Sequence, residues 1–392
     1  MFYNKNNEII QDLDIIYKDL KIDDFVPRIK MMGVGGAGCN ILERMVKEKP
    51  ELFKDIVKVM VNTNKKDLHN QKNADIKLQI GENLTKGNGA GTEWMIGRKG
   101  AEENKEEIIK LLENTDLLYI IAGMGKGTGT GAAPYIAQVA KEKDILTISA
   151  ITTPFDAEGV IRYKTAMTGL DELKKHSDVV YSLSNQKVYV LNKGKNKTMM
   201  ELLKEVDKLL INTVTAISDV ILQKGYFDLD FADLAKITKD KGTAHMGVGT
   251  ASGEGAIFEA TQKALNGELL DSGVRGAKGL IFNIKGPEEK ITATEFYEVM
   301  DILQKEIIDE NCNILPSFRN CIIDGADIEV TLIATGYDDD FESLDTKKFK
   351  EENLQNQQNN FVKEEVKVQT QTQENLEDDD DSIPSYLKGF KN

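Results

Sequence analysis

The chain has 392 residues, 40% of them hydrophobic and 29% charged, a balance typical of a water-soluble protein with two or three domains. Its net charge of −15 argues against a nucleic-acid partner, because nucleic-acid affinity depends on basic contacts to phosphates. The sequence shows no membrane-length apolar run, no signal-peptide pattern and no CxxC or zinc spacing among its three cysteines, so we expect a reducing, cytoplasmic environment without disulfides or a metal cluster.

Strands and helices alternate in the N-terminal half, after an N-terminal extension that we place at residues 1–28. Short apolar stretches at residues 28–32, 55–61, 117–122 and 145–150 are predicted to be strands, with helical patterns between them. This βαβ rhythm predicts a parallel sheet that is covered by helices on both faces. In such sheets, ligands bind beyond the carboxyl ends of the strands.

The first of two glycine loops, Gly33-Val34-Gly35-Gly36-Ala37-Gly38-Cys39-Asn40, follows the first predicted strand and fits the pattern GxGxxG. Glycines let the backbone approach a phosphate, and the N-terminus of the helix that follows offers free N–H groups. A dinucleotide-binding oxidoreductase uses the same pattern, but it needs a carboxylate at the end of the second strand to hold the ribose. That strand ends in Asn62-Thr63-Asn64, which counts against NAD.

The second glycine loop follows the third predicted strand and is denser. Five glycines alternate with Met, Lys and two threonines between Gly123 and Gly131. Such a loop is a poor structural element but a good cradle for an anion. It is not a Walker A loop, which requires a glycine, four residues and then Gly-Lys-Ser/Thr.

A long helix is predicted from Thr198 to about Leu222. Thr198 and Glu201 form a capping-box pattern, a broad apolar stripe follows, and Gly225 is expected to end the helix. The rhythm changes over residues 226–337, where an amphipathic helix at residues 296–307 and an alternating strand at 328–334 are predicted. We therefore expect a second, smaller α+β domain attached to the long helix.

The C-terminal segment differs in composition from the rest. Residues 338–382 carry about fifteen acids against about five lysines and have almost no apolar periodicity, so we predict a disordered acidic tether with a reach of about 35–40 Å. Apolar and basic residues return in residues 383–392. A frayed end is the simplest interpretation, but a sticky peptide on an acidic tether favours a docking role.

Taken together, these residues resemble the FtsZ family, the bacterial cell-division homologues of tubulin. The loop from Gly125 to Gly131 is similar to the tubulin signature, and the resemblance covers roughly residues 29–337 and the last ten. Further matches, all in the family's order, are Asn62-Thr63, Leu84-Thr85-Lys86-Gly87-Asn88-Gly89-Ala90-Gly91, Pro154-Phe155, Glu158-Gly159-Val160-Ile161-Arg162, Asp230-Phe231-Ala232-Asp233-Leu234, Ile333-Ala334-Thr335-Gly336 and Ile383-Pro384-Ser385-Tyr386-Leu387.

The resemblance implies an α/β fold with a Rossmann-like GTPase domain on a parallel sheet, a long central helix and a smaller C-terminal α+β domain. We place the GTP-binding domain at residues 29–197, the central helix at 198–224, the C-terminal domain at 225–337, the acidic linker at 338–382 and the docking peptide at 383–392.

The resemblance also implies that GTP or GDP binds with its phosphates between the two glycine loops, with Mg²⁺ as the assisting ion. The loop at residues 84–91 would close over the γ-phosphate. The residues implied around the phosphates are Gly35, Gly36, Ala37, Gly38, Asn40, Gly125, Lys126, Gly127, Thr128, Gly129, Thr130 and Gly131.

The remaining nucleotide contacts concern the sugar and the base. The resemblance assigns Glu158 to the ribose and Arg162 to the phosphates or sugar, although their spacing alone favours a surface salt bridge. Asn185 would contact the sugar or base. Asp207, on the long helix, would read guanine, because a carboxylate accepts two hydrogen bonds from N1–H and the 2-amino group, a donor pair that adenine lacks.

The implied catalytic residues are Asp230 and Asp233, which would position a water molecule and a hydrated cation. The family places these acids against the nucleotide of the next subunit, so hydrolysis would depend on head-to-tail association into a filament. A helix-start charge pair without a catalytic role is the simpler alternative.

The resulting prediction is an assembly-dependent GTPase that polymerises head-to-tail and forms the cell-division ring in the cytoplasm at midcell. Its docking peptide would bind membrane-tethering and regulatory division proteins, so that the membrane is reached only indirectly. A filament protein that binds nucleotide without hydrolysing it is the second hypothesis, and an NAD oxidoreductase is the third.

Four departures from the family pattern affect the predicted site. Lys126 stands where the family has glycine, Asp228 replaces an asparagine, and Leu203 replaces an aromatic residue that often stacks on the base. Thr92-Glu93-Trp94 replaces the usual Ala-Asn-Pro after the third loop.

Overall fold

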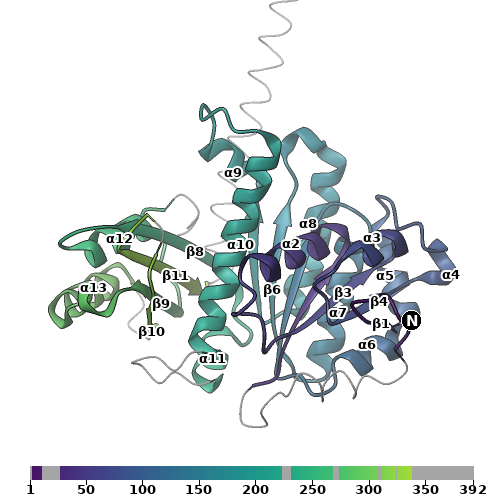
Figure 1. Cartoon of the computed structure of the whole chain (residues 1–392), viewed down its shortest axis with the longest axis horizontal. Coiled ribbons are helices and arrows are strands. Elements are labelled where there is room, and N and C mark those ends of the chain that lie inside the picture. The colour runs from purple at the N-terminus through teal and green to yellow at the C-terminus, as the bar shows by residue number, and fades with distance from the viewer. Residues whose placement is uncertain are drawn as a thin grey trace, which may run out of the picture. The chain divides into compact units, whose positions relative to one another are not determined.

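The computed structural model describes residues 2–10, 27–222, 231–267, 273–307, 311–323 and 325–337 (Figure 1). These residues belong to one compact unit, residues 1–337. The acidic linker, the docking peptide, Gly225, Asp228 and Asp230 lie outside the described residues, so the predictions made for them stay predictions.

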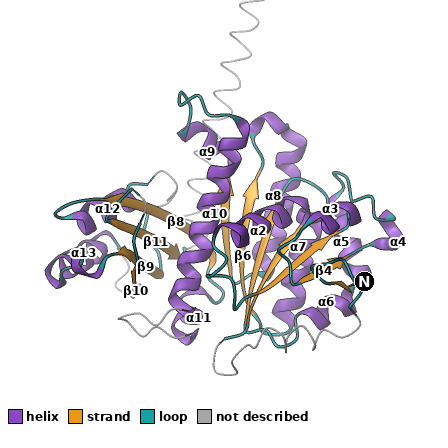
Figure 2. Ribbon diagram, in the orientation of Figure 1, coloured by secondary structure: helices purple, strands orange, loops and turns teal. Residues whose placement is uncertain are grey.

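The strands form one sheet of eleven, in the order β1-β4-β3-β2-β5-β6-β7-β8-β11-β9-β10 (Figure 2). The six neighbouring strands β4, β3, β2, β5, β6 and β7 are all parallel. Strand β1 is antiparallel to β4, and β11 is antiparallel to both β8 and β9. The strands are β1 (Phe2–Tyr3), β2 (Ile29–Val34), β3 (Val57–Asn62), β4 (Ile76–Gln79), β5 (Leu117–Gly123), β6 (Leu146–Thr153), β7 (Val179–Ser184), β8 (Gly242–Ala251), β9 (Gly279–Gly286), β10 (Asn313–Asn320) and β11 (Ile328–Thr335).

The predicted α/β fold with a parallel N-terminal sheet is confirmed. The four stretches predicted as strands correspond to β2, β3, β5 and β6, and nearly all their residues are buried because helices cover both faces. The sequence analysis did not identify β4 and β7, although β4 is fully buried and β7 is largely so.

Helices pack on both faces of the parallel strands (Figure 2). Helices α2, α3, α9 and α10 share one core with the sheet, and α5, α6, α7 and α8 share the other. The helices are α2 (Gly35–Glu48), α3 (Lys65–Asn70), α4 (Glu82–Thr85), α5 (Trp94–Glu103), α6 (Lys105–Leu111), α7 (Thr128–Glu142), α8 (Val160–His176), α9 (Asn185–Leu191), α10 (Met199–Leu222), α11 (Phe231–Thr238), α12 (Ala256–Leu265) and α13 (Ala293–Glu306), with short 3₁₀ turns η1 (Asp156–Glu158) and η2 (Glu288–Lys290).

The long helix α10 is where the sequence predicted it, and its capping box forms. The Glu201 carboxylate accepts from the Thr198 backbone N–H at 2.7 Å, and the Thr198 hydroxyl accepts from the Glu201 N–H at 3.2 Å. The apolar stripe of α10 lies in a single core that contains residues of both β5 and β11, such as Tyr119 and Ile333. The helix therefore joins the two halves of the sheet.

The C-terminal strands carry their own core on the face away from α10. Alternate residues of β9 divide between the two cores: Ile281 lies in the core with α10, while Leu280 and Phe282 pack with α12 and α13. A second capping box, between Thr292 and Glu295, begins α13. The predicted C-terminal helix and strand are thus observed as α13 and β11.

The first residues of the chain do not form a simple extension. Phe2 and Tyr3 make a short antiparallel strand against Leu78 and Lys77 at the edge of the sheet. The Lys77 ammonium, at the end of a buried side chain, donates to the Asn7 side-chain oxygen at 2.7 Å. This strand covers the edge that β4 would otherwise expose.

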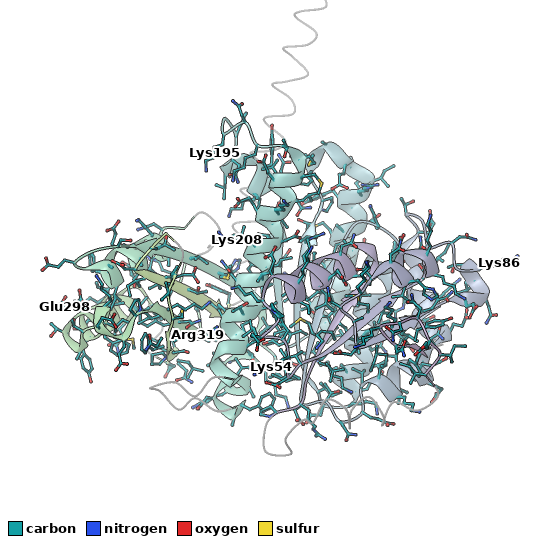
Figure 3. The ribbon with its side chains drawn as sticks, viewed as in Figure 1. Lys54, Lys86, Lys195, Lys208, Glu298 and Arg319 are labelled. Carbon is teal, nitrogen blue, oxygen red and sulfur yellow. The ribbon has the colours of Figure 1, made fainter. Side chains whose placement is uncertain are left out.

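Charged side chains gather on the outside of the molecule, as Lys54, Lys86, Lys195 and Glu298 illustrate (Figure 3). Among the described helices, none has the length and the apolar character needed to cross a bilayer.

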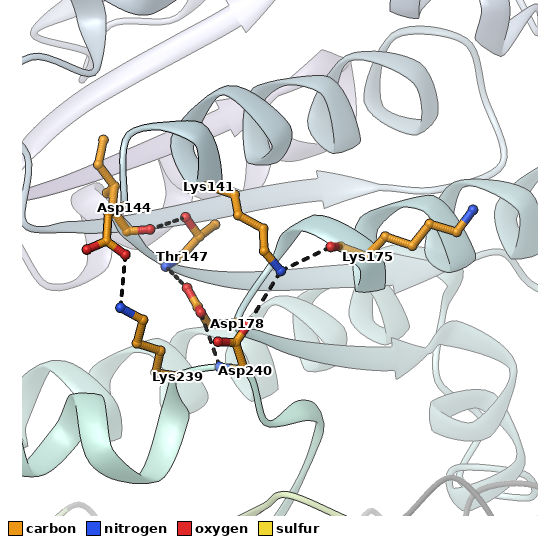
Figure 4. A network of polar contacts seen from close by, with 8 residues as sticks. Lys141, Asp144, Thr147, Lys175, Asp178, Lys239 and Asp240 are labelled. Atoms are coloured by element: carbon orange, nitrogen blue, oxygen red, sulfur yellow. Dashed lines mark hydrogen bonds and ion pairs between the residues drawn. The ribbon is translucent and has the colours of Figure 1, made fainter.

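Asp178 ties the amino ends of β6 and β7 to the segment that follows α11 (Figure 4). Its carboxylate accepts from the backbone N–H of Thr147 at 2.8 Å and from that of Asp240 at 3.1 Å. The Asp178 carbonyl accepts from the N–H groups of Lys241 and Gly242, both at 2.9 Å. One residue thus connects β6 and β7 with the start of β8.

Replacing Asp178 with Ala should lower the free energy of unfolding by about 1–3 kcal/mol, because two backbone N–H groups lose their acceptor. Asp171→Ala is the control, since Asp171 is an exposed acid on α8, where a substitution should change the free energy of unfolding by no more than about 0.5 kcal/mol. Calorimetric melting of both variants checks this. Equal melting temperatures for the two would contradict the bridging role of Asp178.

Candidate functional site

The two glycine loops lie side by side at the carboxyl edge of the sheet. They follow the neighbouring parallel strands β2 and β5, in which Gly33 pairs with Ile121. Gly35 adopts φ +72°, and a Cβ there would stand 2.7 Å from the backbone nitrogen of Gly129. Glycine is therefore required where the loops touch. The two motifs that the sequence predicted to act together are in direct contact.

Helices α2 and α7 begin at these loops, and both N-termini are left uncapped. Neither helix has a side-chain cap, and neither carries an acidic residue in its first turn. The first N–H groups of both helices and the positive ends of their dipoles therefore remain available to an anion. Gly36 is partly exposed, and nothing lies within 4 Å of where its Cβ would be. This arrangement is a cradle for phosphates.

Several residues of the predicted cradle also have internal structural roles. A Cβ at Gly38 would stand 2.1 Å from the Ile121 carbonyl oxygen, and one at Gly131 would stand 2.0 Å from the Trp94 carbonyl oxygen. The Thr130 hydroxyl accepts from the N–H of Gly125 at 2.9 Å. These contacts set the shape of the loops, whereas Gly36, Ala37, Asn40 and Lys126 are at least partly exposed.

The third loop, residues 84–91, closes against the second. The Gly127 N–H donates to the Gly91 carbonyl at 3.1 Å, and the hydroxyls of Thr63 and Thr128 lie 2.7 Å apart. Lys86 has φ +51°, a left-handed conformation in which the chain reverses after α4. Three motifs that are far apart in the sequence thus meet around the start of α7.

Glu158 and Arg162 form an ion pair, as their spacing allowed, but not on one helix. Glu158 lies in η1, Arg162 lies in α8, and Gly159 with φ +93° separates the two elements. Glu158 also accepts from the Phe155 backbone N–H at 3.1 Å. The Arg162 carbonyl lies 2.9 Å from where a Cβ of Gly125 would be, so this segment borders the second glycine loop.

Asp207 is buried on α10, and its partner is Arg44 on α2. The Arg44 Nη2 donates to Oδ1 at 2.8 Å, and Nε lies 2.5 Å from Oδ2. Burial raises the pKa of the Asp207 carboxyl above its ordinary value, and the hydrogen bond and charge of Arg44 oppose that rise. Asp207, which was predicted to bind guanine, is thus already paired with the Arg44 guanidinium.

Asn185 and Asn40 are the two asparagines that were predicted to contact the nucleotide. Asn185 is buried at the start of α9, and its Oδ1 has no hydrogen-bond partner within the described part of the chain. A buried acceptor of this kind is costly unless something donates to it. The Asn40 Oδ1, by contrast, accepts from Gln71 at 3.0 Å.

Asp233 lies elsewhere, half-buried in the first turn of α11. Its predicted companion Asp230 is outside the described residues. Over the ranges that the structure describes, no three His, Cys, Asp or Glu side chains cluster in a way that would hold a metal ion.

Sequence reasoning missed Arg44 and Gln71. Arg44 lies one helical turn after Asn40 on α2, so its position relative to the glycine loop could have been noticed. Its pairing with Asp207 could not, because the two residues are 163 positions apart and only the packing of α2 against α10 brings them together.

Comparison with known proteins identifies the family. The model of the tubulin/FtsZ family GTPase domain matches residues 28–193, and the model of the FtsZ family C-terminal domain matches residues 242–338. The chain belongs to the FtsZ family. Its GTPase domain makes it a GTP-binding protein that hydrolyses GTP, which excludes the oxidoreductase hypothesis.

Solved structures agree with this. An FtsZ from M. jannaschii, solved as a dimer, is 33% identical, with a TM-score of 0.73, over 84% of this chain and 93% of that one. Two CetZ proteins from Haloferax volcanii share the fold at 19% and 16% identity, with TM-scores of 0.68 and 0.66. The first covers 81% of this chain and 98% of its own, and the second covers 82% and 97%.

Two glycines of the first loop give a matched pair of variants. Gly38→Ala should destabilise the protein by about 3 kcal/mol, because the added methyl overlaps the Ile121 carbonyl. Gly36→Ala meets nothing and should change stability by less than about 0.5 kcal/mol. Thermal melting of the nucleotide-free protein distinguishes them, and a stable Gly38→Ala variant would contradict the close packing of α2 on β5.

Proposed function

We propose that this FtsZ-family protein assembles head-to-tail into GTP-dependent filaments that form the cell-division ring, with each active site completed by acids of the adjacent subunit. One observation carries the proposal. The uncapped N-termini of α2 and α7 meet at the carboxyl edge of the sheet, whereas α11, which carries Asp233, lies near the C-terminal end of α10 (Figure 1).

The phosphates of GTP would lie across the two helix N-termini. Backbone N–H groups from Gly35 to Gly38 and from Thr128 to Thr130 would donate to them, and Asn40, Lys126 and the Thr128 and Thr130 side chains would border the same region. Mg²⁺, bound through phosphate oxygens, would supply charge neutralisation during hydrolysis.

The base and ribose would extend from the cradle toward α9 and α10. Asp207 is the guanine acceptor in this proposal, and the unpartnered Asn185 oxygen would accept from the ribose or the base. Glu158 would accept from a ribose hydroxyl, and Arg162 borders the second glycine loop through its backbone.

Distance along α10 supports an active site shared between subunits. From Asp207 to the end of the helix at Leu222 is a rise of about 22 Å, and α11 follows that end. Asp230 and Asp233 would therefore act on the nucleotide of a neighbour, orienting the water that attacks the γ-phosphorus as the bond to GDP breaks. A contact between two different faces repeats into a filament. A related FtsZ has been solved as a dimer, and a CetZ2 protein has been solved as a protofilament with GTPγS bound.

The C-terminal segment would connect these filaments to their partners. In this proposal residues 338–382 are an acidic tether, and Ile383-Pro384-Ser385-Tyr386-Leu387 bind membrane-tethering and regulatory division proteins. The filament would then reach the membrane at midcell through those proteins.

Asp207→Asn tests the base contact. The amide offers one acceptor and one donor, so GTP affinity should fall about 10- to 100-fold. Xanthosine triphosphate carries a carbonyl in place of the 2-amino group, so the variant should prefer it to GTP. Titration calorimetry with both nucleotides measures this, with Asp301→Asn, an exposed site on α13, as the control. Unchanged GTP preference would remove Asp207 from the base site.

Asp233→Asn tests the shared active site. The variant should keep wild-type affinity for GTP but lose at least about 100-fold in turnover, because the attacking water loses its orientation. Phosphate release per wild-type subunit should rise with protein concentration, since a lone subunit lacks the second half of the site. Turnover that is independent of concentration, or retained by Asp233→Asn, would contradict the proposal.

A further inference from the structure

The Arg44–Asp207 pair joins two features that the proposed function treats separately. Arg44 lies on α2, about two and a half turns after the helix start that would hold the phosphates, and Asp207 lies on α10, where guanine would be read. The Asp207 side chain is 6% exposed, and that of Arg44 is 40% exposed. A buried carboxylate is thus neutralised by a cation that reaches it from the surface.

The Arg44 guanidinium and guanine can bind the Asp207 carboxylate through similar chemistry. Arginine presents N–H groups on a planar N–C–N unit to the two oxygens of a carboxylate. Guanine presents N1–H and its 2-amino group on the same kind of N–C–N unit. A guanidinium and a guanine would each bind Oδ1 and Oδ2 of Asp207 with a pair of N–H groups. The carboxylate cannot accept such a pair from both partners at once.

We propose that Arg44 is an internal competitor of guanine for Asp207, so that nucleotide binding requires the guanidinium to leave the carboxylate. This inference rests on the proposed role of Asp207 as the base reader. Arg44 is then a residue that sets nucleotide affinity, and we call its contact with Asp207 the Arg44 latch.

The local contacts favour an exchangeable pair. Across the described residues, Arg44 and Asp207 have only each other as side-chain partners, and the Nε–Oδ2 contact lacks hydrogen-bond geometry despite its short distance. When Arg44 swings away it enters solvent, where its charge is well hydrated. Among the described side chains, no second cation contacts Asp207, so an incoming pair of N–H donors would be the new partner of the buried carboxylate.

Arg28 and Asp116 show how a permanent pair differs. The Arg28 side chain donates to both Asp116 oxygens at 2.9 and 3.0 Å and to Asn114 at 3.1 Å, and the Arg28 backbone N–H adds a fourth bond at 2.8 Å. This pair lies at the amino ends of β2 and β5, opposite the cradle. It is therefore a matched control of the same chemistry.

Arg44→Met tests the latch, since methionine keeps an unbranched apolar stem and removes the competitor. The affinity for GDP at pH 8, measured by titration calorimetry on the full chain, should rise about 3- to 30-fold. The association rate of a fluorescent GDP should rise as well, because no guanidinium has to leave first. Arg28→Met should lower the melting temperature and leave GDP affinity unchanged.

Equal or weaker GDP binding by Arg44→Met would overturn the proposal, the weaker case showing that Arg44 assists the base. Arg44→Lys gives a second measurement should Arg44→Met fold poorly: lysine keeps the charge but cannot present the paired N–H donors, so GDP affinity should lie above that of the wild type. A lysine variant with wild-type affinity would count against competition.

Failure of the latch and failure of the base assignment give different results. If Asp207→Asn alters the choice between GTP and xanthosine triphosphate while Arg44→Met leaves GDP affinity unchanged, only the latch is wrong. If Asp207→Asn leaves base choice unaltered, the proposed function of Asp207 is wrong and the latch falls with it.

Discussion

The contact between Gly35 and Gly129 is the constraint on which the rest of the site depends. It lets two helices begin side by side at the edge of a parallel sheet, with their free N–H groups directed toward the same region. Any side chain at this contact would force the helix starts apart. The cradle is thus made largely of backbone, which explains why glycine predominates in both loops and why Lys126 is their one charged residue.

Around that contact, the proposed function assigns binding and chemistry to different ends of α10. The features that would recognise a guanine nucleotide lie along the carboxyl edge of the sheet and the first half of α10, while the acids proposed for hydrolysis follow the other end of that helix. Under this proposal a single subunit would bind nucleotide, and turnover would be a property of the filament.

Much of this could be predicted from sequence, because the signals are local. The buried strands β2, β3, β5 and β6, the glycine loops and the Thr198–Glu201 cap each depend on residues close together in the chain. Strands β1 and β7 could not be predicted in the same way, since one has two residues and the other lacks a long apolar run. Arg44 and Gln71 were missed because their roles come from tertiary packing. The ion pair of Glu158 with Arg162 was anticipated, yet the break at Gly159 was not.

The Asp178 bridge has a mechanical consequence. It fastens the strands beneath the nucleotide cradle to the beginning of β8 at the amino edge of the sheet, the side opposite the cradle. A rotation of the parallel strands relative to the C-terminal strands would therefore pivot near Asp178. Its amplitude would be largest at the carboxyl edge of the sheet, which is farthest from this residue.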